Sequence, residues 1–219
     1  NIDATKGLVE YFKKADLDIK TKGFIVEFFG NNLRLGNSKI DDEKRDLLAP
    51  LFLKELKNEL KLKERPNYTG TLIESIGKMN VIDAVPTLIS ILDSNAPVEL
   101  KQKTIKALIR IGDEEAVKVL TNHLSKENDE NVKISILDVL KENKKIDGVI
   151  DKLISEFAVE TNAKVKIRII ATMGKDSNQE EVKFLFDELV NSPEFEKQIS
   201  SQLAEVELNN LVEVLNIKP

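Results

Sequence analysis

Few residues of this chain have the type and spacing that a catalytic or metal site requires. His123 is the single histidine, and the chain has no cysteine. A catalytic triad, a histidine-based zinc site or a haem site would need more supporting residues than this. We therefore interpret His123 as an exposed or boundary residue of a helix. The sequence predicts no catalytic residue, no bound metal and no cofactor.

The acidic residues near the N-terminus match a calcium-binding loop only in part. Asp16, Asp18 and Glu27 have suitable spacing, but the loop also needs an oxygen donor at its fifth position and glycine at its sixth. Lys20 and Thr21 occupy those positions. The run at 41–43, Asp-Asp-Glu, is better explained as the start of a helix, where the helix dipole favours negative charge. No Gly-Lys-Ser/Thr core of a phosphate-binding loop occurs.

Most of the aromatic residues in the N-terminal part lie within a short stretch of sequence. They are Tyr11, Phe12, Phe24, Phe28 and Phe29. We expect them to pack the first helices against one another. The functional alternative is a hydrophobic socket for a peptide.

These residues must be positioned by helices, and the clearest pair of helices lies at 97–124. Apolar residues of the first run fall on one helical face, and Gly112 ends the run because glycine adopts the left-handed cap without a Cβ penalty. The second run, from 114 to 124, carries Val117, Leu120 and Leu124 at helical spacing. The stretch therefore predicts a helical hairpin.

Copies of this hairpin recur with a period of 32 or 33 residues. In the first helix, one apolar column is Tyr68, Leu100, Val132 and Val165, and another is Ile76, Leu108, Leu140 and Met173. In the second helix, the columns are Val85, Val117, Ile150 and Val182, then Leu88, Leu120, Leu153 and Leu185, then Leu92, Leu124, Phe157 and Leu189. Independent columns that keep one period indicate stacked repeats, because one hairpin cannot bury its own apolar face.

The flanking segments predict further helices of the same array. Helices are expected at 4–14, at 18–29 with Gly30 as its end, and at 41–63, before the break at Pro66. We expect one domain over 1–219, made of a diverged N-terminal repeat and cap (1–65), regular repeats (66–190) and a C-terminal cap (191–219).

The charge and the hydrophobic pattern of the chain argue against some classes of function. The net charge of −5 argues against a general nucleic-acid binder, which needs a basic field. No apolar run approaches the roughly 20 residues that span a bilayer. The chain starts at Asn1 without a signal peptide, so we interpret it as a trimmed product of either a cytoplasmic or an exported, periplasmic protein. The abundance of Lys, Asn and Ile is typical of an AT-rich bacterial genome.

The repeats resemble the HEAT and HEAT-like (PBS lyase-type) repeat family. The motifs that carry the resemblance are the run 129–133 followed by Ile136, Val139 and Leu140, the run 98–113 followed by 115–117, and the second-helix pattern of Val85, Pro86, Leu88, Ile89 and Leu92. The resemblance implies an all-α, right-handed solenoid of about five helical pairs, an α-α superhelix. It also implies that the second helices line the concave face. Lys101, Lys133 and Lys166 or Arg168 stand where the family often has arginine.

The function expected from these features is that of a non-enzymatic scaffold for a protein or peptide partner, bound on the concave face. The candidate contact residues are polar positions of the second helices that differ between copies: Ser90, Asn122, Ser155 and Asp187, with Pro86, Lys118, Asp151 and Lys183 beside them. No nucleic-acid partner and no membrane span are expected. Two alternatives stay open, a HEAT-like enzyme of the DNA-glycosylase or lyase type and a purely structural module of a larger or exported protein.

Overall fold

The chain folds into helices throughout the part that the structure describes. The computed structural model describes residues 2–14, 16–33, 39–112, 114–143, 146–174 and 179–192. These residues form eleven α-helices and one short 3-10 helix, and they contain no strand. The predicted all-α class is confirmed. The C-terminal cap expected at 191–219 lies outside the described residues from position 193 onward.

The chain divides into two compact units, Asn1–Ala116 and Val117–Pro219. The first unit contains α1 (Ile2–Phe12), α2 (Ile19–Asn32), α3 (Lys39–Leu62), α4 (Pro66–Lys78), η1 (Ile82–Ala84), α5 (Val85–Leu92) and α6 (Val98–Ile111). The chain passes between the units in α7 (Glu114–Leu124), and the second unit continues with α8 (Glu130–Asn143), α9 (Val149–Val159), α10 (Ala163–Met173) and α11 (Gln179–Val190). In chain order the described helices after α1 form the five expected pairs.

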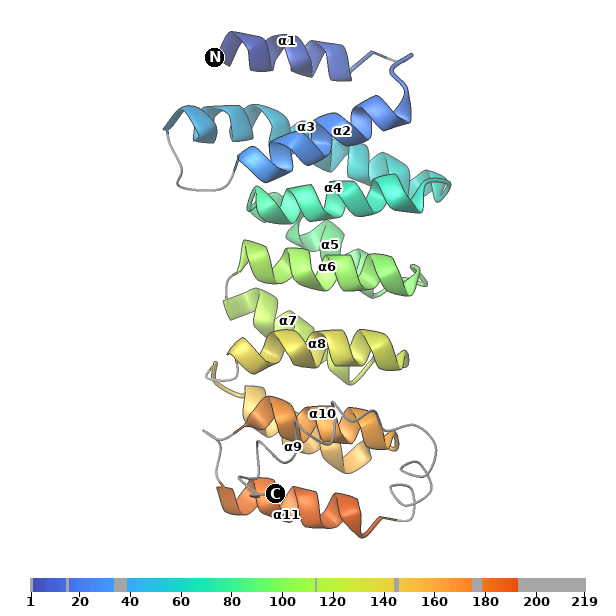
Figure 1. The fold of residues 1–219 in the computed structure, drawn as a ribbon, viewed down its shortest axis with the longest axis vertical. Coiled ribbons are helices and arrows are strands. Elements are labelled where there is room, and N and C mark those ends of the chain that lie inside the picture. Colours follow the sequence, from blue (N-terminus) through green and yellow to red (C-terminus); the bar gives the residue numbers. More distant parts are fainter. Residues whose placement is uncertain are drawn as a thin grey trace, which may run out of the picture. The chain divides into compact units, whose positions relative to one another are not determined.

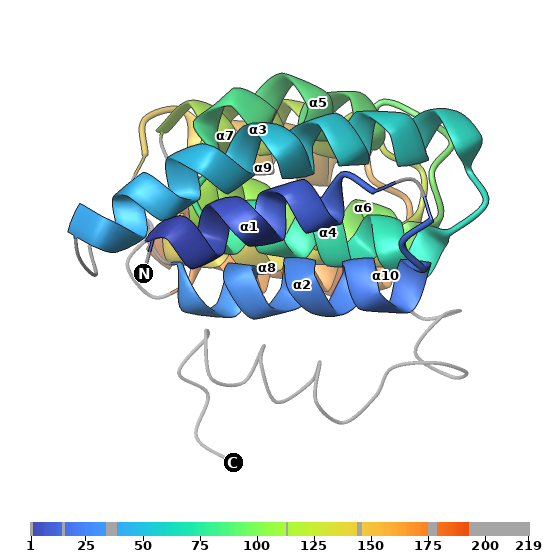
Figure 2. The same cartoon turned by 90° about the horizontal axis from the view of Figure 1, so that it is seen from above.

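The helices of the first unit lie in two layers. Figures 1 and 2 show α2, α4 and α6 on one side and α3 and α5 on the other. The first helices pack directly on one another, α2 on α4 and α4 on α6. In the second unit, α8 packs on α10 in the same way, and α10 also contacts α9 and α11.

Glycines explain how the first helices approach so closely. A Cβ on Gly30 would lie 2.5 Å from the Cβ of Ser75 in α4, and one on Gly77 would lie 2.7 Å from the Cα of Ala107 in α6. The prediction that Gly30 ends its helix was therefore wrong, because α2 continues to Asn32 and uses Gly30 for packing. Gly112 does cap α6 in the left-handed region, with φ of 50°, as predicted.

The repeated apolar columns form the core. All four members of both first-helix columns are buried, and so are the Leu88 and Leu92 columns of the second helices. In the remaining column, Val117 and Val182 are buried, whereas Val85 and Ile150 are partly exposed. The helical period of the sequence thus identified the buried side of each repeat.

Candidate functional site

The predicted contact residues all lie on the exposed side of the second helices. Each core leucine of the second helices is followed two positions later by a member of the variable column, and two positions along a helix lead to the opposite face. The structure describes the eight residues as exposed: Pro86, Ser90, Lys118, Asn122, Asp151, Ser155, Lys183 and Asp187. Their exposure is the condition for binding, and their role in binding stays a prediction.

These residues are distributed over both units. Pro86 and Ser90 belong to α5 of the first unit, and the other six belong to the second unit. The two serine hydroxyls donate to their own helices, Ser90 to the carbonyl of Thr87 at 2.7 Å and Ser155 to that of Asp151 at 2.8 Å. In the described part of the chain, both hydroxyls thus donate to backbone carbonyls and not to the base that a catalytic serine requires.

A cavity of about 420 Å³ opens beside Ser90 in the first unit. Its wall is built by the end of α3, the start of α4, the end of α5 and the turn that leads into α6. Most of the lining is apolar, and it is made by Leu60, Pro66, Ile91, Ala96, Pro97 and Leu100 together with Glu59, Lys63, Thr69, Ser90, Ser94 and Asn95. We call this space the α3–α5 cavity. The sequence alone does not indicate this cavity, because its lining residues come from four separate segments.

A buried carboxylate lines the α3–α5 cavity. The side chain of Glu59 is 3% exposed, and its Oε1 accepts a hydrogen bond from Nη1 of Arg65 at 3.2 Å. Its Oε2 is buried without a hydrogen-bond partner among the described residues. Burial raises the pKa of Glu59 above its usual value, and the charge of Arg65 opposes this rise. A buried carboxylate oxygen without a hydrogen-bond partner costs folding free energy.

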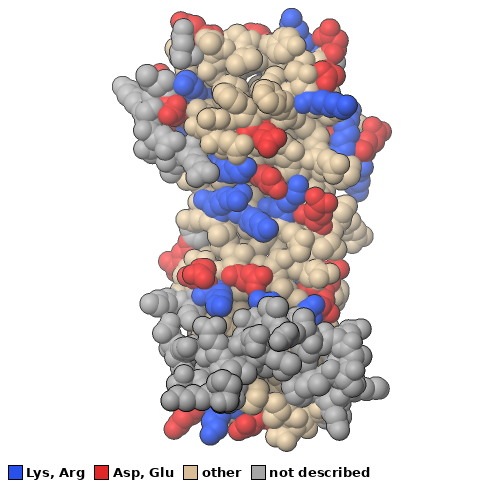
Figure 3. Space-filling view, viewed as in Figure 1, with Lys and Arg blue, Asp and Glu red and all other residues tan. Residues whose placement is uncertain are grey.

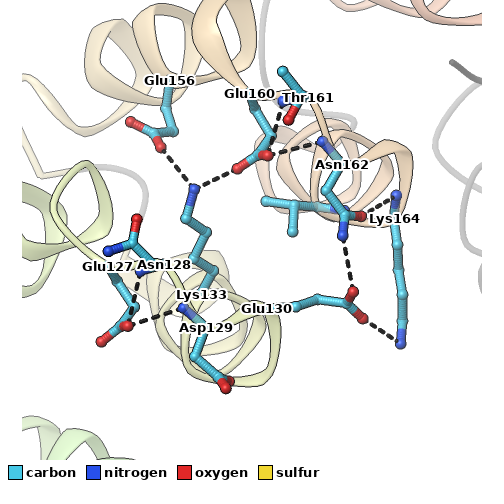
Figure 4. A network of polar contacts seen from close by, with 11 residues as sticks. Glu127, Asn128, Asp129, Glu130, Lys133, Glu156, Glu160, Thr161, Asn162 and Lys164 are labelled. Carbon is cyan, nitrogen blue, oxygen red and sulfur yellow. Dashed lines mark hydrogen bonds and ion pairs between the residues drawn. The ribbon is translucent and has the colours of Figure 1, made fainter. Parts of the chain in front are cut away.

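The second unit contains a polar network around Lys133, shown in Figure 4. The Lys133 ammonium on α8 contacts carboxylates at the end of α9, Glu156 at 3.5 Å and Glu160 more closely. Glu160 also accepts hydrogen bonds from the backbone N–H groups of Thr161 and Asn162, at 2.9 and 2.8 Å. These two backbone hydrogen bonds to Glu160 are made within the turn before α10. The network ties consecutive repeats together, which is a structural role.

A second interaction of the same network joins α8 to α10. Glu130 pairs with Lys164 at 2.8 Å and accepts a hydrogen bond from the side-chain amide of Asn162 at 2.8 Å. The hydrogen bond from Lys164 is the main cause that lowers the pKa of Glu130, and it outweighs burial. Asn162 also caps α10 through the N–H groups of Lys164 and Val165. The turn that contains Asn162 therefore caps the start of α10 and also supports the ion pair between Glu130 and Lys164.

His123 was assigned to an exposed or boundary position, and that assignment was wrong. The residue is only 7% exposed, and Nε2 lies 3.4 Å from Oε2 of Glu127. Glu127 in turn accepts hydrogen bonds from the backbone N–H groups of Asn128 and Asp129. His123 lies in the last turn of α7, and the turn that follows the helix brings Glu127 back onto it, so that both side chains are buried as a pair.

The N-terminal aromatic residues divide between core and surface. Phe12 and Phe29 are buried, whereas Phe24 is 70% exposed and Phe28 is 49% exposed. The rings of Phe24 and Phe28 stack with 6.4 Å between their centroids. The expectation that all of these residues pack inside was therefore too broad. An exposed aromatic pair stands on α2, and its use as a hydrophobic socket for a peptide stays a prediction.

The acidic residues near the N-terminus serve helix starts. Asp18 caps α2 by accepting hydrogen bonds from the N–H groups of Lys20 and Thr21. Asp42, in the first turn of α3, pairs with Arg45 at 2.8 Å. Within the described residues, no group of three or more potential ligand side chains is placed to hold a metal ion.

Charged side chains on one face of the molecule are interleaved. Figure 3 shows basic side chains gathered over α6, which carries Lys101, Lys103, Lys106 and Arg110, with acidic side chains close by. Lys103 illustrates the pairing, since it lies 3.3 Å from Glu74 and 3.4 Å from Glu99. No helix in the described part of the chain is long and apolar enough to cross a membrane.

Residues 53–141 match the family model of the HEAT repeats. The matched segment begins within α3 and ends within α8, and the HEAT-like character predicted from the sequence is confirmed there. Neither the curated proteins nor the solved structures give a significant match to the chain. HEAT repeats generally mediate interactions between proteins.

Proposed function

Because residues 53–141 carry HEAT repeats, we propose that the chain is a non-enzymatic scaffold that binds a protein or peptide partner. The binding surface is the exposed side of the second helices, the side expected to be concave. Ser90, Asn122, Ser155 and Asp187 are its central positions.

The observation that carries this proposal is the contrast between two neighbouring columns of the second helices. The buried column is leucine in every copy, at Leu88, Leu120, Leu153 and Leu185. Two residues further on, the exposed column differs in every copy except for the two serines. A residue that the fold requires is the same in every copy. A position without a packing role can vary between copies and can specialise for a partner. Affinity would then come from a few anchors among many modest contacts.

The proposal is tested with a variant that combines Ser90→Arg, Asn122→Arg and Ser155→Arg. These side chains are exposed, so the variant should keep the helical circular-dichroism spectrum and the melting temperature of the parent. It should lose a protein that the parent recovers from native cell extract, because three bulky cations would obstruct the surface. Quantitative mass spectrometry of the recovered proteins measures the loss.

A matched control places the same three charges on first helices. Asn67→Arg, Gln102→Arg and Asn131→Arg change α4, α6 and α8 and should leave recovery of the partner intact. Equal recovery by the parent and the second-helix variant would exclude this surface. Tight binding of duplex DNA by the parent at physiological salt would instead favour the enzyme alternative of the DNA-glycosylase type.

A further inference from the structure

The contact between Lys133 and Glu160 joins two positions that recur with the period of the array. Lys133 follows directly after a buried first-helix column, and Glu160 lies three residues after the last buried second-helix column. One period further on, the same two positions are Lys166 and Ser192. The next copy of the hairpin, made by α10 and α11, therefore keeps the lysine of this contact but has a serine in place of the glutamate.

The two lysines consequently differ in their surroundings. The Lys133 ammonium contacts the carboxylates of Glu156 and Glu160, as Figure 4 shows. The Lys166 ammonium instead lies 4.6 Å from the centre of the Phe157 ring. An aromatic face attracts a cation, but it does not replace the oxygen acceptors that an ammonium group with three N–H donors can use. The Lys166 ammonium therefore has donors available for a carboxylate.

A cavity of about 200 Å³ opens beside Lys166. It lies among the end of α9, the start of α10 and the end of α11, all in the second unit, and its lining includes Val159, Leu189 and Ser192. We call this space the α9–α11 cavity. Its volume is below the roughly 300 Å³ at which small-molecule sites begin, so it suits a single side chain better than a whole ligand. Lys166 itself is partly exposed, so a group that enters the cavity can reach it.

Two neighbouring carboxylates leave Lys166 without a counter-charge. Glu160 also lines the cavity, but it is engaged by Lys133 and by two backbone N–H groups of the turn before α10. Glu188 on α11 occupies the position that Glu156 has in the preceding copy, and it is exposed. Neither carboxylate forms an ion pair with Lys166 in the part of the chain that the structure describes. The charge of Glu160 is compensated, whereas that of Lys166 is not.

We propose that the α9–α11 cavity binds a glutamate side chain of the protein partner, whose carboxylate accepts hydrogen bonds from the Lys166 ammonium. The partner's carboxylate would take the place that Glu160 has beside Lys133, so the preceding copy supplies the model for this contact. An apolar side chain would leave the ammonium without an acceptor, and a cationic one would be repelled. The inference rests on the proposed scaffold function and adds one contact outside its eight surface positions.

The test is a titration of the isotope-labelled full chain, followed by NMR. The probes are two pentapeptides with blocked ends, in which four alanines flank a central glutamate or a central glutamine, so that only the glutamate peptide carries a charge. The glutamate peptide should bind about tenfold more tightly, as expected for a charge-assisted hydrogen bond. It should shift the backbone amide signals of Thr161, Ala163 and Ser192, which line the cavity.

Variants of the lysine separate its charge from the space around it. Lys166→Met should lower the affinity for the glutamate peptide to that for the glutamine peptide, whereas Lys166→Arg should preserve the difference. Lys183→Met is the matched control, because it removes an exposed cation of α11 that does not line the cavity, and it should change neither affinity. Circular dichroism checks that each variant is folded.

Ser192→Glu tests the same contact from inside the chain. It should restore the pairing of the preceding copy, raise the urea midpoint and prevent binding of the glutamate peptide. The gain in the urea midpoint should disappear when Lys166→Met is combined with it. Ser192→Gln, which has the same size without the charge, should do neither. This arm decides the question even if Lys166→Met alone fails to fold.

Equal affinity of the parent for the two peptides would overturn the inference, and so would a difference that survives in folded Lys166→Met or in Ser192→Glu. Glutamate binding that appears only in Glu194→Gln would also overturn it, because the chain's own Glu194, two positions after Ser192, would then be the occupant. The titration needs no partner protein and uses none of the eight surface positions, so its failure is distinct from a failure of the pull-down that tests the scaffold.

Discussion

Lys133 shows how a single residue can bind two repeats together. Burial alone would raise the pKa of Glu160, but hydrogen bonds from Lys133 and from the N–H groups of Asn162 and Thr161 outweigh it and lower the pKa below 4.5. Burial would lower the pKa of Lys133, and its contacts with Glu160 and Glu156 raise the pKa instead. Each group therefore holds its charge more firmly in the folded chain.

The pH dependence of this interaction follows from the lowered pKa of Glu160. A carboxylate with a depressed folded pKa stabilises the fold above its unfolded pKa, and the contribution is lost as the pH falls through the folded value. The Lys133–Glu160 contact should thus contribute fully near pH 7 and fade below about pH 4.5 as Glu160 becomes protonated. On the alkaline side it should persist until Lys133 loses its proton above its usual pKa of 10.5.

We predict that Lys133→Met lowers the free energy of unfolding by roughly 3 kcal/mol at pH 7, because two buried carboxylates lose their cation. The difference from the parent should shrink as the pH is lowered from 5 toward the folded pKa of Glu160. Urea unfolding at a series of pH values measures this. Lys183→Met, at an exposed position of α11, is the control and should change stability little at any pH. A pH-independent loss in Lys133→Met would show that packing, and not charge, is what Lys133 provides.

At the scale of the helix, close approach between first helices depends on glycine. Gly77 lies in the last turn of α4, where it faces the backbone of Ala107 in α6. The obstruction is backbone and not the flexible end of a side chain, so neither helix can yield by a simple rotamer change. Gly7 in α1 offers the contrast, because a Cβ there would meet nothing within 4 Å.

Gly77→Ala should destabilise the chain by about 1–3 kcal/mol through overpacking. Gly7→Ala should stabilise it by about 0.5–1 kcal/mol. Alanine gives the unfolded chain fewer backbone conformations than glycine does, and its Cβ meets no clash in the folded α1. Thermal and urea unfolding of the two variants measure both signs. Stabilisation by Gly77→Ala would mean that α4 and α6 are further apart than the structure indicates.

At the scale of the whole molecule, stability comes from apolar columns that repeat through both units. Ala107 belongs to the first unit and Leu120 to the second, and both are completely buried. In a repeat array each copy depends on its neighbours, so damage in one copy weakens those next to it.

Ala107→Asp and Leu120→Asp should each cost about 3 kcal/mol or more, because each buries a charge without a partner. The urea midpoint reports this loss, and the slope of the transition shows whether the chain still unfolds as one cooperative body. Asn122→Asp adds the same charge at an exposed position of α7 and is the matched control. Urea transitions of the two core variants that coincide with the parent would refute the assignment of the repeated columns to the core.

The sequence by itself determined the helical pairs and their buried sides. Period and helix spacing are local properties, so the columns through Leu88 and Leu108 could be identified before the fold was known, as could the cap at Gly112. The eight second-helix positions followed from the same reasoning, because a residue two places from a core leucine must point away from the core.

The tertiary structure decided the features that depend on contacts between distant segments. Gly30 resembles a helix end until Ser75 of another helix is seen against it. His123 resembles a surface residue until the turn after α7 folds Glu127 back onto it. The α3–α5 cavity and the unpartnered oxygen of Glu59 arise where four segments converge. Periodicity records which side of a helix is buried, but it does not record which residue of another helix lies opposite, and that contact is what gives these residues their roles.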